Sequence, residues 1–245
     1  MPQFESTRPQ GEPELMRVSS FRRYLAEMHR RSPDAGASTR LSSLNPSLMA
    51  DLMRFEHGGR GADVLEVLAA CVRHGRALTI HLQCADKVLP LTVFPRERLV
   101  HCPVDPQTIL AGQPAELPVL QVEVALLRPP GGGEAQEAGE PHLLYHPLAP
   151  LLWTFAMRGV RGALLPEVAG TAVYRVSPAF DVTQVAEGPV RDVLSDMRRT
   201  VMSLREIGQR PGIGAELAAR LVNALYLQSG LIVSRSHPGA LSISG

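Results

Sequence analysis

The sequence predicts an α+β protein in which an antiparallel β meander packs with helices, followed by a winged-helix-like helical unit at the C-terminus. Two observations carry this prediction. An amphipathic helical segment leads directly into three short strands joined by tight turns, and the last quarter of the chain is mainly helical and ends in a short apolar strand. The 245 residues are 44% hydrophobic, which is enough for a buried core in one large domain or two small ones.

We predict three regions, starting with a tail, a helix and a linker over residues 1–46. Residues before about 15 are polar and contain prolines, which is typical of a disordered terminus. Apolar residues recur near every 3.6 positions over 15–31 and predict a helix. A serine-rich stretch at 32–43 reads as a linker, and Asn45-Pro46 opens a second short helix that ends at Phe55.

The α+β core is predicted to span residues 47–188. Asp63 is placed to cap a helix that ends at His74-Gly75. Period-two alternation over 77–84 predicts a strand with Leu78, Ile80, Leu82 and a buried thiol at Cys84 on one face, and with Thr79, His81 and Gln83 on the other. Short turns then lead to strands at 88–94 and 99–102. The remaining predicted elements of the core are a strand at 119–127, a flexible loop at 129–141, a helix at 148–158 and a strand at 172–176.

The C-terminal unit is predicted to span residues 189–245. It reads as helical over 189–230 with a break at Arg210-Pro211-Gly212, and then as a strand at 231–234. Ser203 and Glu206 have the spacing of a capping box. A second helix from about Ala215 ends at Gly230, and this order resembles the winged helix-turn-helix pattern.

Such a unit binds DNA or protein, and the outward face of the second helix decides between them. Glu216, Arg220 and Asn223 are predicted to face outward, which gives one arginine and one asparagine for base contacts, and an acid that opposes phosphate. The Gly-Ile-Gly turn also resembles a helix-hairpin-helix phosphate site, although Arg210 stands where an apolar residue is usual. The candidate partner- or DNA-contacting residues are Arg205, Arg210, Glu216, Arg220, Asn223 and Arg235.

Charge and cysteine usage favour a cytoplasmic protein with no broad affinity for polyanions. The net charge is +1, with an acidic middle (4 Arg against 9 acids, net −5, over 103–189) beside a cationic end (7 Arg against 4 acids, net +3, over 190–245). Of the 25 cationic residues 24 are arginine, which is typical of GC-rich bacteria. Three cysteines lack disulfide spacing, and neither a signal peptide nor a membrane-spanning run is expected.

We expect no enzyme active site, no cofactor and no metal. The sequence contains neither a nucleophile elbow nor a phosphate-binding loop, and its paired carboxylates fall in the predicted loop. A zinc site would need His81 and Cys84 to converge, but residues three apart on a strand face opposite ways. An enzyme of unfamiliar type remains an alternative that a cleft lined by ionisable residues would favour.

The helix, the strand of Gly75–Ile80, the strand at 91–94 and the segment Arg98–His101 together resemble PATAN-type bacterial signalling domains. The Leu225–Leu231 step is similar to the small winged-helix-like unit that often ends them. Glu97 stands where these domains usually have a glycine. The resemblance implies a non-enzymatic fold that works through protein contacts.

The sequence therefore predicts a non-catalytic bacterial regulatory or adaptor protein in signalling, whose partner is another protein or a second copy of itself. The alternative is a DNA-binding transcriptional regulator that uses the C-terminal unit. A second candidate contact surface is the polar face of the meander, with His81, Gln83, Lys87, Arg96 and Arg98.

Overall fold

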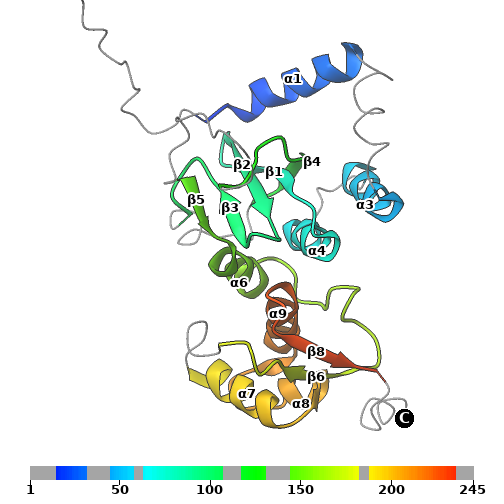
Figure 1. The fold of residues 1–245 in the computed structure, drawn as a ribbon, viewed down its shortest axis with the longest axis vertical. Coiled ribbons are helices and arrows are strands. Elements are labelled where there is room, and N and C mark those ends of the chain that lie inside the picture. Colours follow the sequence, from blue (N-terminus) through cyan, green and yellow to red (C-terminus); the bar gives the residue numbers. More distant parts are fainter. Residues whose placement is uncertain are drawn as a thin grey trace, which may run out of the picture.

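The computed structural model describes residues 15–31, 45–57, 63–106, 117–130, 144–181 and 188–235. The predicted α+β class is confirmed, with a five-stranded antiparallel sheet and a three-stranded antiparallel sheet (Figure 1). The helices are α1 (Val18–Arg31), α3 (Pro46–His57), α4 (Val64–His74), α6 (Leu148–Arg158), α7 (Gly188–Arg199), α8 (Leu204–Gly208) and α9 (Gly214–Leu227). The strands are β1 (Leu78–Cys84), β2 (Lys87–Phe94), β3 (Leu99–His101), β4 (Val119–Val124), β5 (Tyr145–Pro147), β6 (Val173–Val176), β7 (Met202–Ser203) and β8 (Leu231–Ser234).

The predicted meander forms the centre of the larger sheet, whose strand order is β4-β1-β2-β3-β5. Strand β1 pairs with β2 in a register that sets Leu78 opposite Val93 and Ile80 opposite Leu91, and all four side chains are buried. Strand β4 joins the free edge of β1 and ends at Val124, earlier than predicted. The short strand β5 was not predicted.

The helix before the meander has both predicted end signals. The Asp63 carboxylate accepts a hydrogen bond from the Leu65 N–H at 3.0 Å, and Gly75 adopts φ +57° at the other end, where its N–H donates to the Val72 carbonyl. A left-handed φ at this position favours glycine. The loop leaving α4 can therefore turn at once into β1.

One prediction about the meander is wrong. Cys84 was expected to be a buried thiol, but it is exposed. It occupies the last position of β1, opposite Lys87 and directly before the turn at Ala85, so it lies beyond the part of the sheet that the helices cover.

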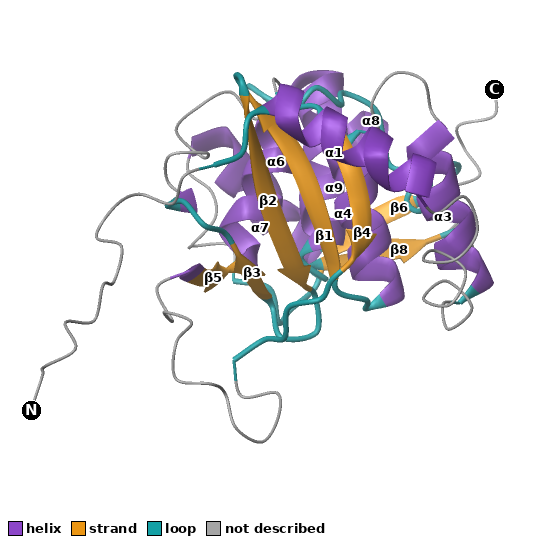
Figure 2. Cartoon of the chain, turned by 90° about the horizontal axis from the view of Figure 1, so that it is seen from above, coloured by secondary structure: helices purple, strands orange, loops and turns teal. Residues whose placement is uncertain are grey.

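The layers place α9 in the interior. Helices α4 and α6 cover one face of the large sheet, α9 packs against α6 and α4, and the small sheet lies beyond α9 (Figure 1). One continuous cluster of buried residues runs through all of these layers. Helix α1 lies on the opposite face of the large sheet (Figure 2), where Val18, Phe21 and Val88 form a separate small cluster.

The C-terminal elements follow the predicted order, with one difference. The helical stretch is broken at Thr200–Ser203 as well as near the predicted Pro211, and β7 occupies this first break. The small sheet has the order β7-β6-β8, so its middle strand comes from before α7. The domain boundary predicted at 188/189 stays a prediction, and β6, which precedes it, pairs with strands that follow it.

Gly230 has a structural role other than ending α9. The left-handed residue after the helix is Ser229, with φ +57°. A Cβ added at Gly230 would lie 2.5 Å from Cδ2 of Phe180. The glycine therefore allows the backbone to pass directly over the Phe180 ring.

Candidate functional site

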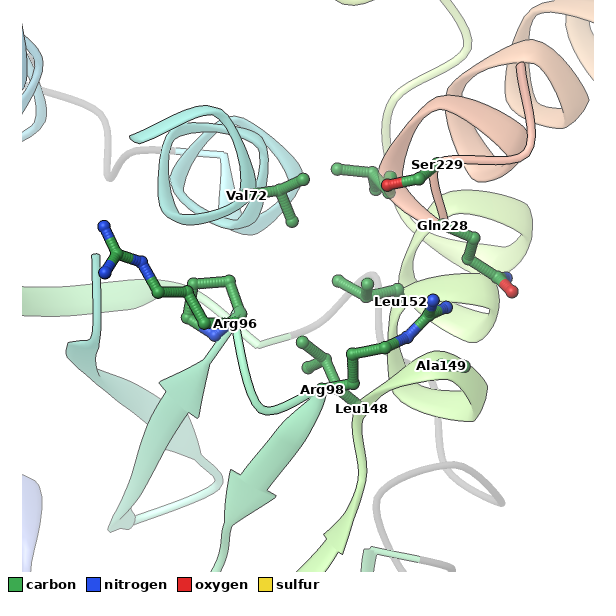
Figure 3. Close-up of a pocket in the computed structure, with 10 residues that line it drawn as sticks. Val72, Arg96, Arg98, Leu148, Ala149, Leu152, Gln228 and Ser229 are labelled. Atoms are coloured by element: carbon green, nitrogen blue, oxygen red, sulfur yellow. The ribbon is translucent and has the colours of Figure 1, made fainter. Parts of the chain in front are cut away.

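A small pocket opens where four elements meet on one side of the molecule (Figure 3). Its walls are the end of α4, the turn between β2 and β3, the first turn of α6 and the end of α9. The volume is about 170 Å³, room for about six water molecules. The pocket thus joins the turn of the large sheet to the last turn of the interior helix.

Two arginines from the turn between β2 and β3 line the pocket, but they point in different directions. In Figure 3 the Arg98 side chain extends toward the amide of Gln228, whereas the Arg96 guanidinium points away from α9. The Arg96 side chain passes over Gly75, where its Nε would lie 3.3 Å from an added Cβ. This places a cation at the C-terminal end of α4, where the helix dipole is negative. Arg98 is the arginine directed into the pocket.

Gln228, at the end of α9, lines the pocket and carries a buried donor without a partner in the described part of the chain. The residue is only 5% exposed, and its Nε2 has no hydrogen-bond partner among the described residues. Buried polar groups are normally paired because an unpaired one loses its bonds to water without replacement. The Nε2 atom is therefore an unpaired donor that lies beneath the surface of the pocket wall.

The backbone is strained at two positions in the pocket wall. Arg98 and Ser229 both have φ +57°, and Ala85 is the third such non-glycine residue in the described ranges. A left-handed conformation costs an ordinary residue about 1–2 kcal/mol. A strained conformation persists because the surrounding fold holds it in place, and strained residues cluster at binding and active sites.

The meander surface predicted from the sequence is not one open patch. Helix α1 crosses the face that carries His81, whose Nε2 lies 3.0 Å from Glu123 Oε1 and whose ring lies 4.8 Å from that of Phe21. Gln83 is half-buried and donates to the Ala85 carbonyl. Lys87 is exposed at the start of β2, about 24 Å along the strand from its other end. The predicted group is therefore split, and Arg96 and Arg98 belong to the pocket.

The predicted outward face of the second helix is wrong at Asn223. Asn223 is fully buried, accepts from the Leu165 N–H and donates to the Ala163 carbonyl, both at 2.9 Å. Arg220 is half-buried, donates to the Met157 carbonyl at 3.1 Å and pairs with Glu216, which is exposed. The physical reason is that α6 and the loop after it cover this side of α9, and a winged-helix pattern alone does not indicate such a cover.

The other predicted C-terminal arginines lie at the surface. Arg205 is exposed on α8, and Arg210 forms an ion pair with Asp196 at 3.0 Å. Arg235 donates to the carbonyls of Glu167 and Ala169. The last two therefore hold neighbouring elements together, while Arg205 remains available for contact.

Sequence reasoning missed the outward face of α1 as a candidate surface. Tyr24 and Met28 lie four residues apart on one side of the helix, and each is about half exposed (50% and 51%). Arg23 and Arg30 are exposed seven residues apart on the outer side, and neither has an ion-pair partner among the described residues. The signal was present in the sequence, since residues 17–31 contain five arginines and one glutamate.

The titratable residues near α3 and α4 form a cluster of ion pairs. Asp51 contacts Arg73 and lies 2.9 Å from Nε2 of His74, while Arg73 also pairs with Glu167. Burial raises the pKa of Asp51, but the hydrogen bonds from His74 and Arg73 and the charges of Arg73 and Arg54 outweigh it, so the pKa lies below its usual value. These groups hold α3, α4 and the loop after α6 together.

Neither the cysteines nor the histidines gather into a metal site in the described ranges. Burial raises the pKa of Cys71 to about 12 and that of Cys102 to about 11, so both remain thiols at neutral pH. His81 and Cys84 are the pair that was considered for zinc. His81 is hydrogen-bonded to Glu123, and Cys84 is exposed at the end of β1.

No family model matches the sequence, and comparisons with curated proteins and with solved structures also find no match. The resemblance to PATAN-type domains therefore remains a prediction. In the described part of the chain, no helix has both the length and the apolar character needed to cross a bilayer.

Proposed function

We propose that this chain is a non-catalytic, cytoplasmic regulatory or adaptor protein of a bacterial signalling system, and that it acts by protein–protein contact through the outward face of α1. The observation that carries the proposal is that this face combines exposed arginines with exposed Tyr24 and Met28. Arginine, tyrosine and methionine are enriched in protein interfaces.

The partner we propose is a protein with an acidic surface. Residues 17–31 carry a net charge of +4, from five arginines and one glutamate, with histidine neutral. Opposite potentials across an interface speed association and select the partner. Among the large hydrophobic residues that are exposed in the described ranges, Met16, Tyr24 and Met28 belong to α1 or the residues before it, so the same surface also offers apolar contact area.

The packing of α1 favours a protein over a membrane surface. Membrane-bound amphipathic helices insert their apolar face between lipids. The apolar face of α1, with Val18, Phe21 and Leu25, already packs on Val88 and Leu120. What remains exposed is a cationic face with two half-exposed side chains, which suits a protein surface.

The burial of α9 supports protein contact over DNA binding. A recognition helix must expose hydrogen-bond donors that can contact base edges in the major groove. Asn223 is buried, and Arg220 is bonded to Met157 and Glu216. The groups expected to contact bases therefore already have partners within the chain.

The polar groups of the pocket support a binding role over a catalytic one. The pocket contains guanidinium and amide groups, which donate hydrogen bonds. The carboxylates around Asp51 and Arg161 lie in ion pairs that join helices and loops. The ion pairs are suited to holding structural elements together, and the polar groups of the pocket are suited to forming hydrogen bonds.

Affinity capture from extract of the source cells tests the proposal, with the double variant Arg23→Glu/Arg30→Glu compared with the wild type. The matched control is Arg205→Glu, which reverses one exposed charge on α8. We expect the amount of at least one captured partner to fall about tenfold with the α1 variant and to stay unchanged with the control. The same partner, once purified, must bind more weakly as salt rises. If the α1 variant retains every protein that the wild type captures, the proposal is wrong.

A further inference from the structure

The strands at the edges of the two sheets differ in how open they are to a further strand. An edge strand exposes a row of N–H and C=O groups, and proteins limit pairing there with short strands, prolines, charges and bulges. Strand β7 has only two residues, β5 has three and ends in Pro147, and β4 carries Glu123 and a register shift against β1. Strand β8 has four residues, Leu-Ile-Val-Ser, with neither a proline, nor a charge, nor a register shift. It is therefore the edge that opposes an added strand least.

The ladder between β6 and β8 determines which backbone groups of β8 point away from the sheet. The Ser177 N–H donates to the Gly230 carbonyl at 2.8 Å, so these two opposite residues form a hydrogen-bonded pair. Such pairs alternate along an antiparallel ladder, so the backbone groups of Ile232 also face β6, whereas those of Leu231 and Val233 point away from it. No described residue bonds to the outward groups of Leu231 and Val233. The edge thus offers two donors and two acceptors.

The side chains around this edge do not oppose a further strand. Ile232 is 47% exposed. Arg175, which lies opposite Ile232 on β6, donates to the Arg198 carbonyl at 3.2 Å. Arg235, which follows β8 directly, donates to two carbonyls of the loop before β6. Both neighbouring cations are therefore held by their own chain, and the side chain at the centre of the edge is apolar.

A second copy of the chain fits this edge because β8 is complementary to itself. If two β8 strands run antiparallel with Ile232 opposite Ile232, then Leu231 of each copy lies opposite Val233 of the other. Leu231 and Val233 are the two residues with outward N–H and C=O groups, so four main-chain hydrogen bonds form around the two-fold axis. The two Ile232 residues form a non-hydrogen-bonded pair, in which side chains approach most closely, so the exposed apolar groups cover each other.

We infer that two copies of this chain associate through their β8 strands and join their small sheets into one continuous sheet. The exposed, uncharged edge centred on Ile232 carries this inference. Because only four residues of each chain pair, the contact is smaller than a permanent dimer needs, and the association is weak and depends on concentration. This contact is independent of the proposed function, because α1 lies on the far side of the large sheet from the layer that contains β8 (Figures 1 and 2).

Analytical ultracentrifugation of the full chain, from about 10 µM to about 1 mM, tests the inference. We expect the weight-average mass to rise with concentration toward twice that of one chain. Ile232→Lys places two cations opposite each other at the two-fold axis and should weaken the association about tenfold or more. The control Val160→Lys changes a 67% exposed residue after α6 and should leave the association unchanged. A single-chain mass at every concentration overturns the inference, and so does equal association of the wild type and Ile232→Lys.

Disulfide trapping tests whether β8 is the contact. The variants are made in a Cys84→Ser background, because Cys84 is exposed while Cys71 and Cys102 are buried. Facing residues of a non-hydrogen-bonded pair have Cα atoms about 4.5 Å apart, within reach of a disulfide. Ile232→Cys should therefore form a covalent dimer with oxidised glutathione, whereas Val160→Cys should remain a single chain. Thermal unfolding shows that each variant is folded. A yield of covalent dimer from Ile232→Cys no higher than from Val160→Cys contradicts the assignment to β8.

Discussion

The buried side chain of Asn223 accepts a hydrogen bond from the backbone N–H of Leu165 at 2.9 Å. The Asn223 amide also donates to the Ala163 carbonyl at 2.9 Å. A single residue of α9 therefore satisfies one backbone N–H and one carbonyl of the loop that runs from α6 to β6. This contact gives α9 a structural role and explains why the face that was predicted to contact DNA bases is covered.

The first prediction concerns Asn223→Leu. The variant removes both hydrogen bonds and leaves the Leu165 N–H and the Ala163 carbonyl without partners, so we expect the free energy of unfolding to fall by about 2–4 kcal/mol. Urea denaturation measures it. The control Arg205→Ala, at an exposed site, should change the value by about 0.5 kcal/mol or less. Comparable stability of the two variants would show that the loop contact is unimportant.

The second prediction compares two glycines. A Cβ at Gly230 meets the ring of Phe180 at 2.5 Å, whereas a Cβ at Gly162 meets only the flexible Glu216 side chain, with Cγ at 2.8 Å. We expect Gly230→Ala to lower the unfolding free energy by about 1–3 kcal/mol, because a packed ring must shift. Gly162→Ala should have a much smaller effect in the same denaturation experiment. The reverse order would contradict the close packing of Gly230 on Phe180.

The third prediction concerns the capping box of α8. The Ser203 hydroxyl accepts from the Glu206 N–H at 3.3 Å, and Glu206 Oε2 accepts from the Ser203 N–H at 2.7 Å. Ser203→Ala should cost about 1 kcal/mol. Thermal unfolding checks this value, and a change near zero would show that the cap does not stabilise the fold.

The fourth prediction is a pH dependence at Asp51. Its pKa lies below the ordinary value in the folded chain because burial is outweighed by His74, Arg73 and Arg54. A carboxyl with a lowered folded pKa stabilises the fold above its unfolded pKa, and this contribution is lost as pH falls through the folded value. Asp51→Asn should therefore lower the free energy of unfolding at neutral pH. Below about pH 4 the difference in unfolding free energy between the variant and the wild type should become smaller. Urea titrations at both pH values measure this difference, and a difference that widens in acid would contradict this reasoning.

The fifth prediction concerns the independence of α1. Val18, Phe21 and Val88 form a cluster separate from the main core. We expect Phe21→Ala to speed hydrogen exchange throughout α1 while the amides of β1 keep their protection. Faster exchange in both elements would mean that α1 belongs to the same cooperative unit as the sheet.

Local signals allowed much of the fold to be predicted. The Asp63 and Gly75 caps, the alternation over β1 and the Ser203 capping box each depend on neighbouring residues, and all three appear in the structure. Strand β5 is stabilised by pairing with β3. It has only three residues, which is too few for a periodic pattern to predict it. Its position depends on tertiary contacts.

The candidate site was harder to predict for the same reason. The pocket combines Arg98, Leu148 and Gln228, which are far apart in sequence, and no pattern links them. Asn223 was assigned to an exposed face because helical spacing gives relative orientation but does not show which faces are covered. The arginines of α1 were visible in the sequence, but their exposure follows from which side of the helix the sheet buries.

In-cell photo-crosslinking tests the central claim most directly, with Tyr24→p-benzoylphenylalanine on α1 compared with Glu216→p-benzoylphenylalanine at the exposed start of α9. The claim that α1 contacts a protein predicts a discrete crosslinked protein from position 24 and none from position 216. Crosslinks from position 216 alone would contradict it, since they would assign the contact to the C-terminal unit.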